Sequence, residues 1–91
     1  MTTLDELLGP CRYLKVLDLF LENPEELMNL REIARRLNKN PGTITPILPI
    51  LLQRNYITST KIGTKIVAYQ LNKNSKIIKH LQKLLKQAEE N

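Results

Sequence analysis

Two kinds of side chain in this sequence have the chemistry to bind a partner. Small hydrogen-bonding residues cluster between Asn40 and Thr45, and basic residues stand before and after them. Asparagine and threonine form hydrogen bonds, whereas arginine and lysine pair with anions. The candidate contact residues are Arg35, Arg36, Lys39, Asn40, Gly42, Thr43, Thr45, Pro46, Gln53, Lys61, Gly63 and Lys65. Together they predict a surface for an anionic partner that also carries hydrogen-bonding groups.

The charge of the chain is unevenly distributed. Of its 14 basic and 9 acidic residues, residues 1–30 carry two basic and six acidic ones, and residues 31–91 carry the other twelve basic and three acidic ones. Such an asymmetry is typical of proteins that bind a polyanion. A lysine-rich surface that only keeps the protein soluble would give the same counts, so charge alone leaves both interpretations open.

Residues that usually carry catalysis or bind metals are scarce. Cys11 is the only cysteine and His80 the only histidine, so the sequence offers no Cys/His ligand set and no internal disulfide. The three glycines lie far apart and form no phosphate-binding loop. We therefore expect no enzyme activity, no cofactor and no metal site.

The elements that must position these residues can be predicted from periodicity and capping. A length of 91 residues predicts a single domain. Three helices are predicted over residues 4–8, 10–22 and 30–37. Thr3 and Asn29 are suitable N-caps for the first and third, Asn23 and Pro24 end the second, and residues 38–40 form a polar turn.

The next helix is predicted from Asn40, its N-cap, to Arg54, and it contains Pro46 and Pro49. Each proline removes a backbone N–H and crowds the preceding turn, so we expect a kinked or locally irregular helix. At about 100° per residue one face is apolar and should be buried. That face consists of Ile44, Ile47, Leu48, Leu51 and Leu52. The outward face has no charged residue between Lys39 and Arg54.

A hairpin and a last helix follow. β-forming residues from Tyr56 to Leu71 predict two strands around a turn at Ile62 and Gly63. An amphipathic helix is predicted over residues 74–89, and its apolar stripe could dock on the protein's own core or on a second copy. We favour a dimer, because the core is complete by Leu71. The predicted interface residues are Leu4, Leu8, Ile77, Ile78, Leu81, Leu84 and Leu85.

The order helix, turn, helix and hairpin resembles the winged helix-turn-helix of MarR-, ArsR- and PadR-like regulators. The segment from Leu30 to Ile57 carries the resemblance, with Ala34 inside its first helix, and the similarity extends over residues 11–71. It implies a mainly α fold with a β-hairpin, and duplex DNA binding by the amino end of the second helix. Regulators of this kind usually place Arg, Lys or Gln where Pro46 and Pro49 stand here, which predicts modest sequence discrimination.

The function expected from these observations is a dimeric DNA-binding transcriptional regulator. In size and composition the chain is similar to small archaeal, plasmid or viral regulators. We expect it in the cytoplasm, associated with the nucleoid, without a small-molecule effector and without membrane contact, because its apolar runs fall far below the roughly 20 residues of a membrane span. Two alternatives stay open: a plasmid partition protein that coats DNA, and a winged helix that binds protein through Pro46, Pro49 and Ile50.

Overall fold

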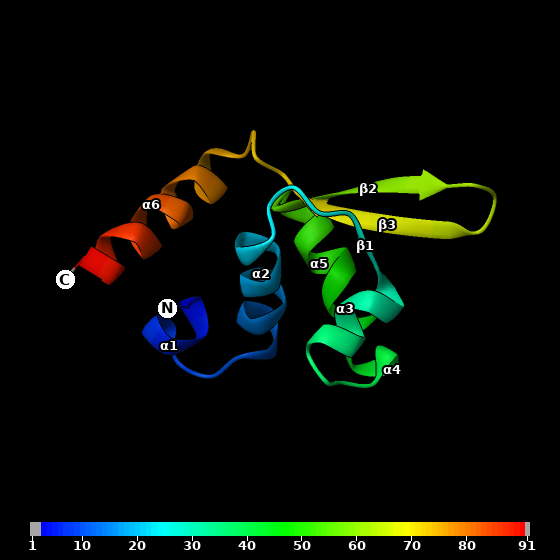
Figure 1. The fold of residues 1–91 in the computed structure, drawn as a ribbon, viewed down its shortest axis with the longest axis horizontal. Coiled ribbons are helices and arrows are strands. Elements are labelled where there is room, and N and C mark those ends of the chain that lie inside the picture. The colour runs from blue at the N-terminus through cyan, green and yellow to red at the C-terminus, as the bar shows by residue number, and fades with distance from the viewer. Residues whose placement is uncertain (1–2, 91) are drawn as a thin grey trace.

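The computed structural model describes residues 3–90, which form six helices and a small antiparallel sheet (Figure 1). In chain order the elements are α1 (Leu4–Leu8), α2 (Arg12–Glu22), β1 (Met28–Asn29), α3 (Leu30–Arg36), α4 (Pro41–Ile44), α5 (Ile47–Gln53), β2 (Ile57–Ile62), β3 (Ile66–Leu71) and α6 (Lys76–Glu90). The helices α3, α4 and α5 and the hairpin β2–β3 lie toward one end of the long axis. Helix α1 and the carboxyl end of α6 lie toward the other.

The core is built mainly from the apolar faces of α2, α3 and α5 together with the sheet. Phe20 of α2 and Ile33 of α3 have no exposed surface, and Met28 of β1 has 1%. Four of the five residues predicted to be buried on the proline-containing helix are confirmed as core, while Leu52 is half-buried at its margin. Burial of this face fixes which side of α5 remains outside.

A third strand joins the predicted hairpin. The strand order is β1-β3-β2, and all pairs are antiparallel. In β1, Met28 pairs with Tyr69 and Asn29 with Ala68. Strand β1 was not predicted, because two residues are too short to show an alternating pattern. This strand ties the start of α3 to the base of the hairpin.

The prolines interrupt the helix as predicted. Helix α4 ends at Ile44 and α5 begins at Ile47, although Thr45 and Pro46 keep right-handed helical dihedral angles between them. Because a proline has no N–H to donate, Pro46 leaves the Gly42 carbonyl without its usual helical partner. The expectation of a locally irregular helix is therefore confirmed.

Helix α1 is held on α2 by a buried carboxylate. The backbone N–H groups of Leu4 and Asp5 donate to the two carboxylate oxygens of Asp18, at 2.8 and 3.0 Å. Thr3 caps the same helix, as predicted, because its hydroxyl accepts from the Glu6 N–H at 3.2 Å. Burial raises the pKa of Asp18, and the two backbone hydrogen bonds partly offset that shift. A side chain distant in sequence thus satisfies the first turn of α1.

Replacing Asp18 by Asn should loosen α1. The amide keeps one acceptor oxygen but turns an NH₂ group toward a backbone N–H that it cannot satisfy. We expect the free energy of unfolding in urea to fall by about 1–2 kcal/mol. The same substitution type at exposed Glu6, Glu6→Gln, should change it by less than about 0.5 kcal/mol. An unchanged urea midpoint for Asp18→Asn would contradict this role.

The last helix divides its apolar stripe between the core and the surface. Ile78 is fully buried within the protomer, and Leu81 and Leu85 pack against the core. Ile77 and Leu84 remain 51% and 43% exposed. The predicted dimer interface is therefore corrected at Ile78, and equally at Leu4, which is 1% exposed in the core. Both side chains are already covered by their own chain.

Among residues 3–90, no helix is long and apolar enough to cross a membrane.

Candidate nucleic-acid interface

A tight turn connects α3 to α4 and exposes the amino end of α4. Asn38 adopts a left-handed conformation (φ 54°), and the Lys39 N–H donates to the Ala34 carbonyl at 2.9 Å. Asn40 caps α4, since its carboxamide oxygen accepts from the Gly42 N–H at 3.4 Å and Pro41 occupies the first turn. The predicted turn and cap are confirmed. They place Asn40 and Gly42 at the surface.

The surface around Gly42 is open. A Cβ atom at this position would meet only Oδ1 of Asn40, at 4.0 Å, so packing within the protomer does not require glycine here. The exposed neighbours on α4 and α5 are Thr45, Pro46, Pro49 and Gln53. The Thr45 hydroxyl donates to the Pro41 carbonyl at 2.9 Å, which leaves its oxygen free to accept. The exposed side of the α4–α5 segment is thus uncharged, with few hydrogen-bonding groups.

Basic residues from two parts of the chain meet beside this segment. Arg12 and Lys15 of α2, Lys39 of the turn and Thr43 of α4 line a hollow of about 180 Å³, which we call the cationic pocket. Its floor is apolar and includes Val16 and Ile44. Thr43 points into this hollow and is half-buried. Lys39 and Thr43 were predicted as contact residues. Arg12 and Lys15 were not, because both belong to the acidic part of the chain.

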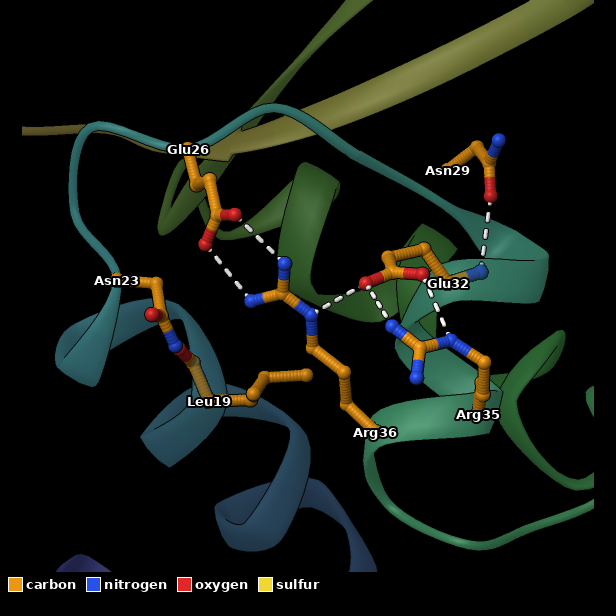
Figure 2. Close-up of polar contacts among 7 residues, drawn as sticks. All are labelled: Leu19, Asn23, Glu26, Asn29, Glu32, Arg35 and Arg36. Carbon is orange, nitrogen blue, oxygen red and sulfur yellow. Dashed lines mark hydrogen bonds and ion pairs between the residues drawn. The ribbon is translucent and has the colours of Figure 1, made fainter.

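Arg36 makes ion pairs that the sequence did not predict. Its guanidinium lies between two carboxylates, donating from Nη1 and Nη2 to Glu26 at 2.7 and 2.6 Å and from Nε to Glu32 at 2.6 Å (Figure 2). It therefore ties α3 to the loop that follows α2, where the Asn23 amide also donates to the Leu19 carbonyl at 2.9 Å. Because its Nε, Nη1 and Nη2 groups all donate to carboxylates, we leave Arg36 out of the contacts proposed below.

Arg35 shares one of these carboxylates but remains open to solvent. It donates to Glu32 from Nε at 3.0 Å and from Nη2 at 2.6 Å, and its side chain is 71% exposed. Asn29 caps α3 by accepting from the Glu32 N–H at 2.9 Å, as predicted. Exposed ion pairs of this kind are weak in water, so Arg35 can exchange its partner for another anion.

Protonation of Glu32 should weaken this network. Hydrogen bonds from Arg35 and then Arg36 lower the pKa of Glu32 from 4.5 to about 2. A carboxylate with a depressed pKa in the folded state contributes stability above its unfolded pKa, and that contribution is lost as pH falls. We expect the thermal midpoint to drop between about pH 4.5 and pH 2, with a smaller drop in Glu32→Gln. The same change at exposed Glu89 is the control, and identical pH profiles for all three proteins would contradict the assignment.

The hairpin projects away from the body as a wing. In β2 and β3, Lys61 faces Val67 and Ile62 faces Ile66, and the exposed turn between the strands contains Gly63 and Lys65. Gly63 has a left-handed φ of 67°, a conformation that L side chains rarely adopt. Lys61 and Lys65 are both exposed, as the sequence predicted for residues that flank the tip.

A groove joins the wing to the start of α3. Arg31, Asn29 and Leu30 line one side, and Lys65, Ile66 and Val67 line the other, around a volume of about 420 Å³. Arg31 was not among the predicted contact residues, although it belongs to the same basic half of the chain. The structure thus arranges the candidate residues in two neighbouring places: the cationic pocket beside α4, and the groove beside the wing.

A helix-turn-helix whose second helix is exposed, followed by a β-hairpin wing, defines the winged helix-turn-helix class, and this is the fold of DNA-binding transcriptional regulators. The chain belongs to the IclR helix-turn-helix domain family, whose model matches residues 11–60. The predicted fold class is therefore confirmed. A comparison with curated proteins found no match.

Solved structures of bacterial regulators have the same fold. The chain is similar to ZitR of Lactococcus lactis in complex with DNA (15% identity, TM-score 0.62, covering 97% of this chain and 62% of that one). It is also similar to reduced HlyU of Vibrio cholerae (19% identity, TM-score 0.64, covering 81% of this chain and 75% of that one). The ferric uptake regulator of Francisella tularensis with iron is a third match (18% identity, TM-score 0.60, covering 69% of this chain and 52% of that one). The chain spans about half the length of the first structures that it matches.

The match with an iron-containing regulator raises the question of a metal site in this chain. Within the part that the structure describes, no group of three or more His, Cys, Asp or Glu side chains could hold a metal ion. Cys11 is half-buried and forms no disulfide.

Proposed function

We propose that this chain binds double-stranded DNA and acts as a transcriptional regulator. The observation that carries the proposal is the exposed amino end of α4, which lies beside the cationic pocket and toward the same end of the fold as the wing. A helix presented in this way fits the major groove and reaches base edges with its first residues. No aspartate or glutamate lies between Glu32 and Glu89, so α4, α5 and the wing carry no acidic side chain that would oppose a polyanion.

The proposed contacts fall into two groups. Asn40, Gly42 and Thr45, with Pro46 and Gln53 further along, would face the bases. Backbone phosphates would be held by Arg12, Lys15, Arg31, Arg35, Lys39, Thr43, Lys61, Gly63 and Lys65. Phosphate contacts position a protein on the duplex, whereas base contacts select the sequence. The chain therefore offers many candidate phosphate contacts and few candidate base contacts.

A second candidate function follows from the uncharged reading face. The α4–α5 segment offers no arginine or lysine for bidentate contact with guanine, so discrimination between sequences would be modest or would depend on DNA shape. Modest discrimination between sequences is sufficient for a partition protein that coats DNA. Footprinting separates the two functions, because a regulator protects one discrete site while a coating protein extends its footprint as its concentration rises.

We further propose that α6 mediates a homodimer. Its exposed apolar residues Ile77 and Leu84 are seven positions apart, which places them on one face of the helix, and Leu8 of α1 is 65% exposed. A two-fold dimer would present two α4–α5 segments about one DNA turn apart, roughly 34 Å. That no small-molecule effector is needed stays a prediction.

The salt dependence of binding tests the role of the cationic pocket. In Arg12→Gln with Lys15→Gln, two phosphate contacts would be lost, so the slope of log K against log salt should fall by about 2 for a duplex of any sequence. The matched control is Lys79→Gln with Lys83→Gln on α6, which removes the same charge away from the proposed interface and should leave the slope unchanged.

Each result of this titration has a distinct meaning. Absence of binding to any duplex at low salt would contradict the proposed function and favour a winged helix that binds protein. Binding with an unchanged slope in the Arg12 and Lys15 variant would contradict only the pocket's role.

A further inference from the structure

The tip of the wing carries apolar side chains that lie outside the hydrophobic core and remain about half exposed. Ile62, Ile66 and Val67 are 46%, 51% and 39% exposed, although β-branched apolar residues are normally buried. Ile62 and Ile66 are direct partners in the strand register, so their side chains leave the same face of the hairpin as neighbours. Val67 is paired with Lys61 and leaves the opposite face. The Ile62–Ile66 pair therefore forms a small apolar blade at the end of the hairpin.

The surroundings of the blade indicate what it would meet. Lys61 precedes Ile62 and Lys65 precedes Ile66, so each isoleucine has a cation next to it in the chain. Lys65 and Ile66 also line the groove that Arg31 closes from the side of α3. A second copy of this cationic tip would be repelled. A partner that is anionic on its outside and apolar within is complementary to it, and the base stack of a duplex between its phosphates has this character.

We propose that the wing is a DNA-kinking wedge. This inference rests on the proposed DNA binding and extends it. Ile62 and Ile66 enter the minor groove and partly unstack one base step, while Lys61, Lys65 and Arg31 hold the flanking phosphates. Apolar wedges of this kind kink duplexes by about 20–90°. Pyrimidine–purine steps unstack most easily, so the wing would select flexible sequences and supply the discrimination that the uncharged α4–α5 face lacks.

The test compares bending with binding in a blade variant. Ile62→Thr with Ile66→Thr keeps both residues β-branched, so the strands are preserved while the apolar tips become polar. The probe is a duplex of about 30 base pairs, labelled at both ends for energy transfer, with 2-aminopurine at a central TA step. The wild-type protein should shorten the end-to-end distance and raise 2-aminopurine fluorescence. The variant should lose both signals while its affinity falls by less than about tenfold and its salt slope stays the same.

Leu27→Thr is the control, because Leu27 is an exposed apolar residue (46%) outside both the wing and the groove, and its replacement should leave bending intact. Binding by the wild-type protein without bending or unstacking would overturn the wedge and leave the proposed function standing. Failure of the wild-type protein to bind any duplex would overturn both. Self-association without DNA that the Ile62→Thr and Ile66→Thr changes abolish would assign the blade to a second copy and overturn the wedge.

Discussion

Reversing the charge of both wing lysines, Lys61→Glu with Lys65→Glu, is expected to weaken binding to every duplex on the order of a hundredfold at about 0.1 M salt. The lysines flank the Gly63 turn and are exposed, so their replacement disturbs no packing. Each reversal removes one phosphate contact and places a carboxylate against the DNA backbone. Because phosphate contacts carry no sequence information, the loss should be similar for all sequences.

Two lysines of α6 provide the control for the wing variant. Lys79→Glu with Lys83→Glu makes the same change in net charge, but on a helix that points away from the wing (Figure 1). Affinity should then fall several-fold at most, since only the long-range field changes and salt screens it. Equal losses in the two double variants would mean that net charge, and not the wing, sets the affinity. An unchanged affinity in the wing variant would remove the wing from the interface.

Placing charges on the exposed stripe of α6, as Ile77→Glu with Leu84→Glu, is expected to convert a dimer into monomers. Ile78 still docks the helix on its own core, so the protomer should keep its fold and its circular dichroism spectrum. A monomer loses the effective concentration that links two DNA-binding surfaces, and the affinity for a two-site duplex should drop by about 10² to 10⁴. Sedimentation equilibrium gives the mass, and fluorescence anisotropy gives the affinity.

A second double variant of α6 tests whether the position of the new charges on the helix determines the loss of the dimer. Lys76→Glu with Lys83→Glu is the control, because it adds two glutamates to the lysine-rich face of the same helix, about 100° around from Ile77 and Leu84, and should leave the dimer intact. A wild-type protein that is monomeric at tens of micromolar, or a dimer that survives the Ile77 and Leu84 changes, would contradict the assignment of α6.

Local rules accounted for most of the fold. Asn29 and Asn40 cap helices as their positions before apolar runs predicted, and Asn55 takes the left-handed conformation (φ 62°) that ends α5. The helix is interrupted at Pro46, because a proline ring leaves no backbone N–H to donate. These features depend on residues within one turn of each other, so the sequence alone defines them.

Features that depend on tertiary contacts could not be predicted in this way. Strand β1 exists because β3 offers Met28 and Asn29 an edge to pair with. In the sequence, Asp18 looks like any other acidic residue of α2. Its role in satisfying the first N–H groups of α1 exists only because α1 packs against α2. On α6, Ile77 and Ile78 are adjacent on one apolar stripe. The packing of α6 against the rest of the protomer buries Ile78 and leaves Ile77 exposed.

The candidate site was partly predictable for the same reason. Lys39, Lys61 and Lys65 flank recognisable turns, and the structure leaves all three exposed. Arg36 could not be separated from Arg35 without knowing that Glu26, ten residues earlier, folds back onto it. Arg12 reaches the cationic pocket only because α2 packs beside α4. One signal was available: Arg12 and Lys15 occupy the first turn of their helix, apart from the acidic residues that follow.

The central claim is that the amino end of α4 enters a groove of duplex DNA with the wing beside it. Titrating the ¹⁵N-labelled protein with a duplex of about 20 base pairs, and following its amide resonances, tests this claim most directly. The largest shifts should occur at residues 39–45 and 61–66, with little change on the outer face of α6. Shifts confined to α1 and α6, or no shifts at low salt, would contradict it.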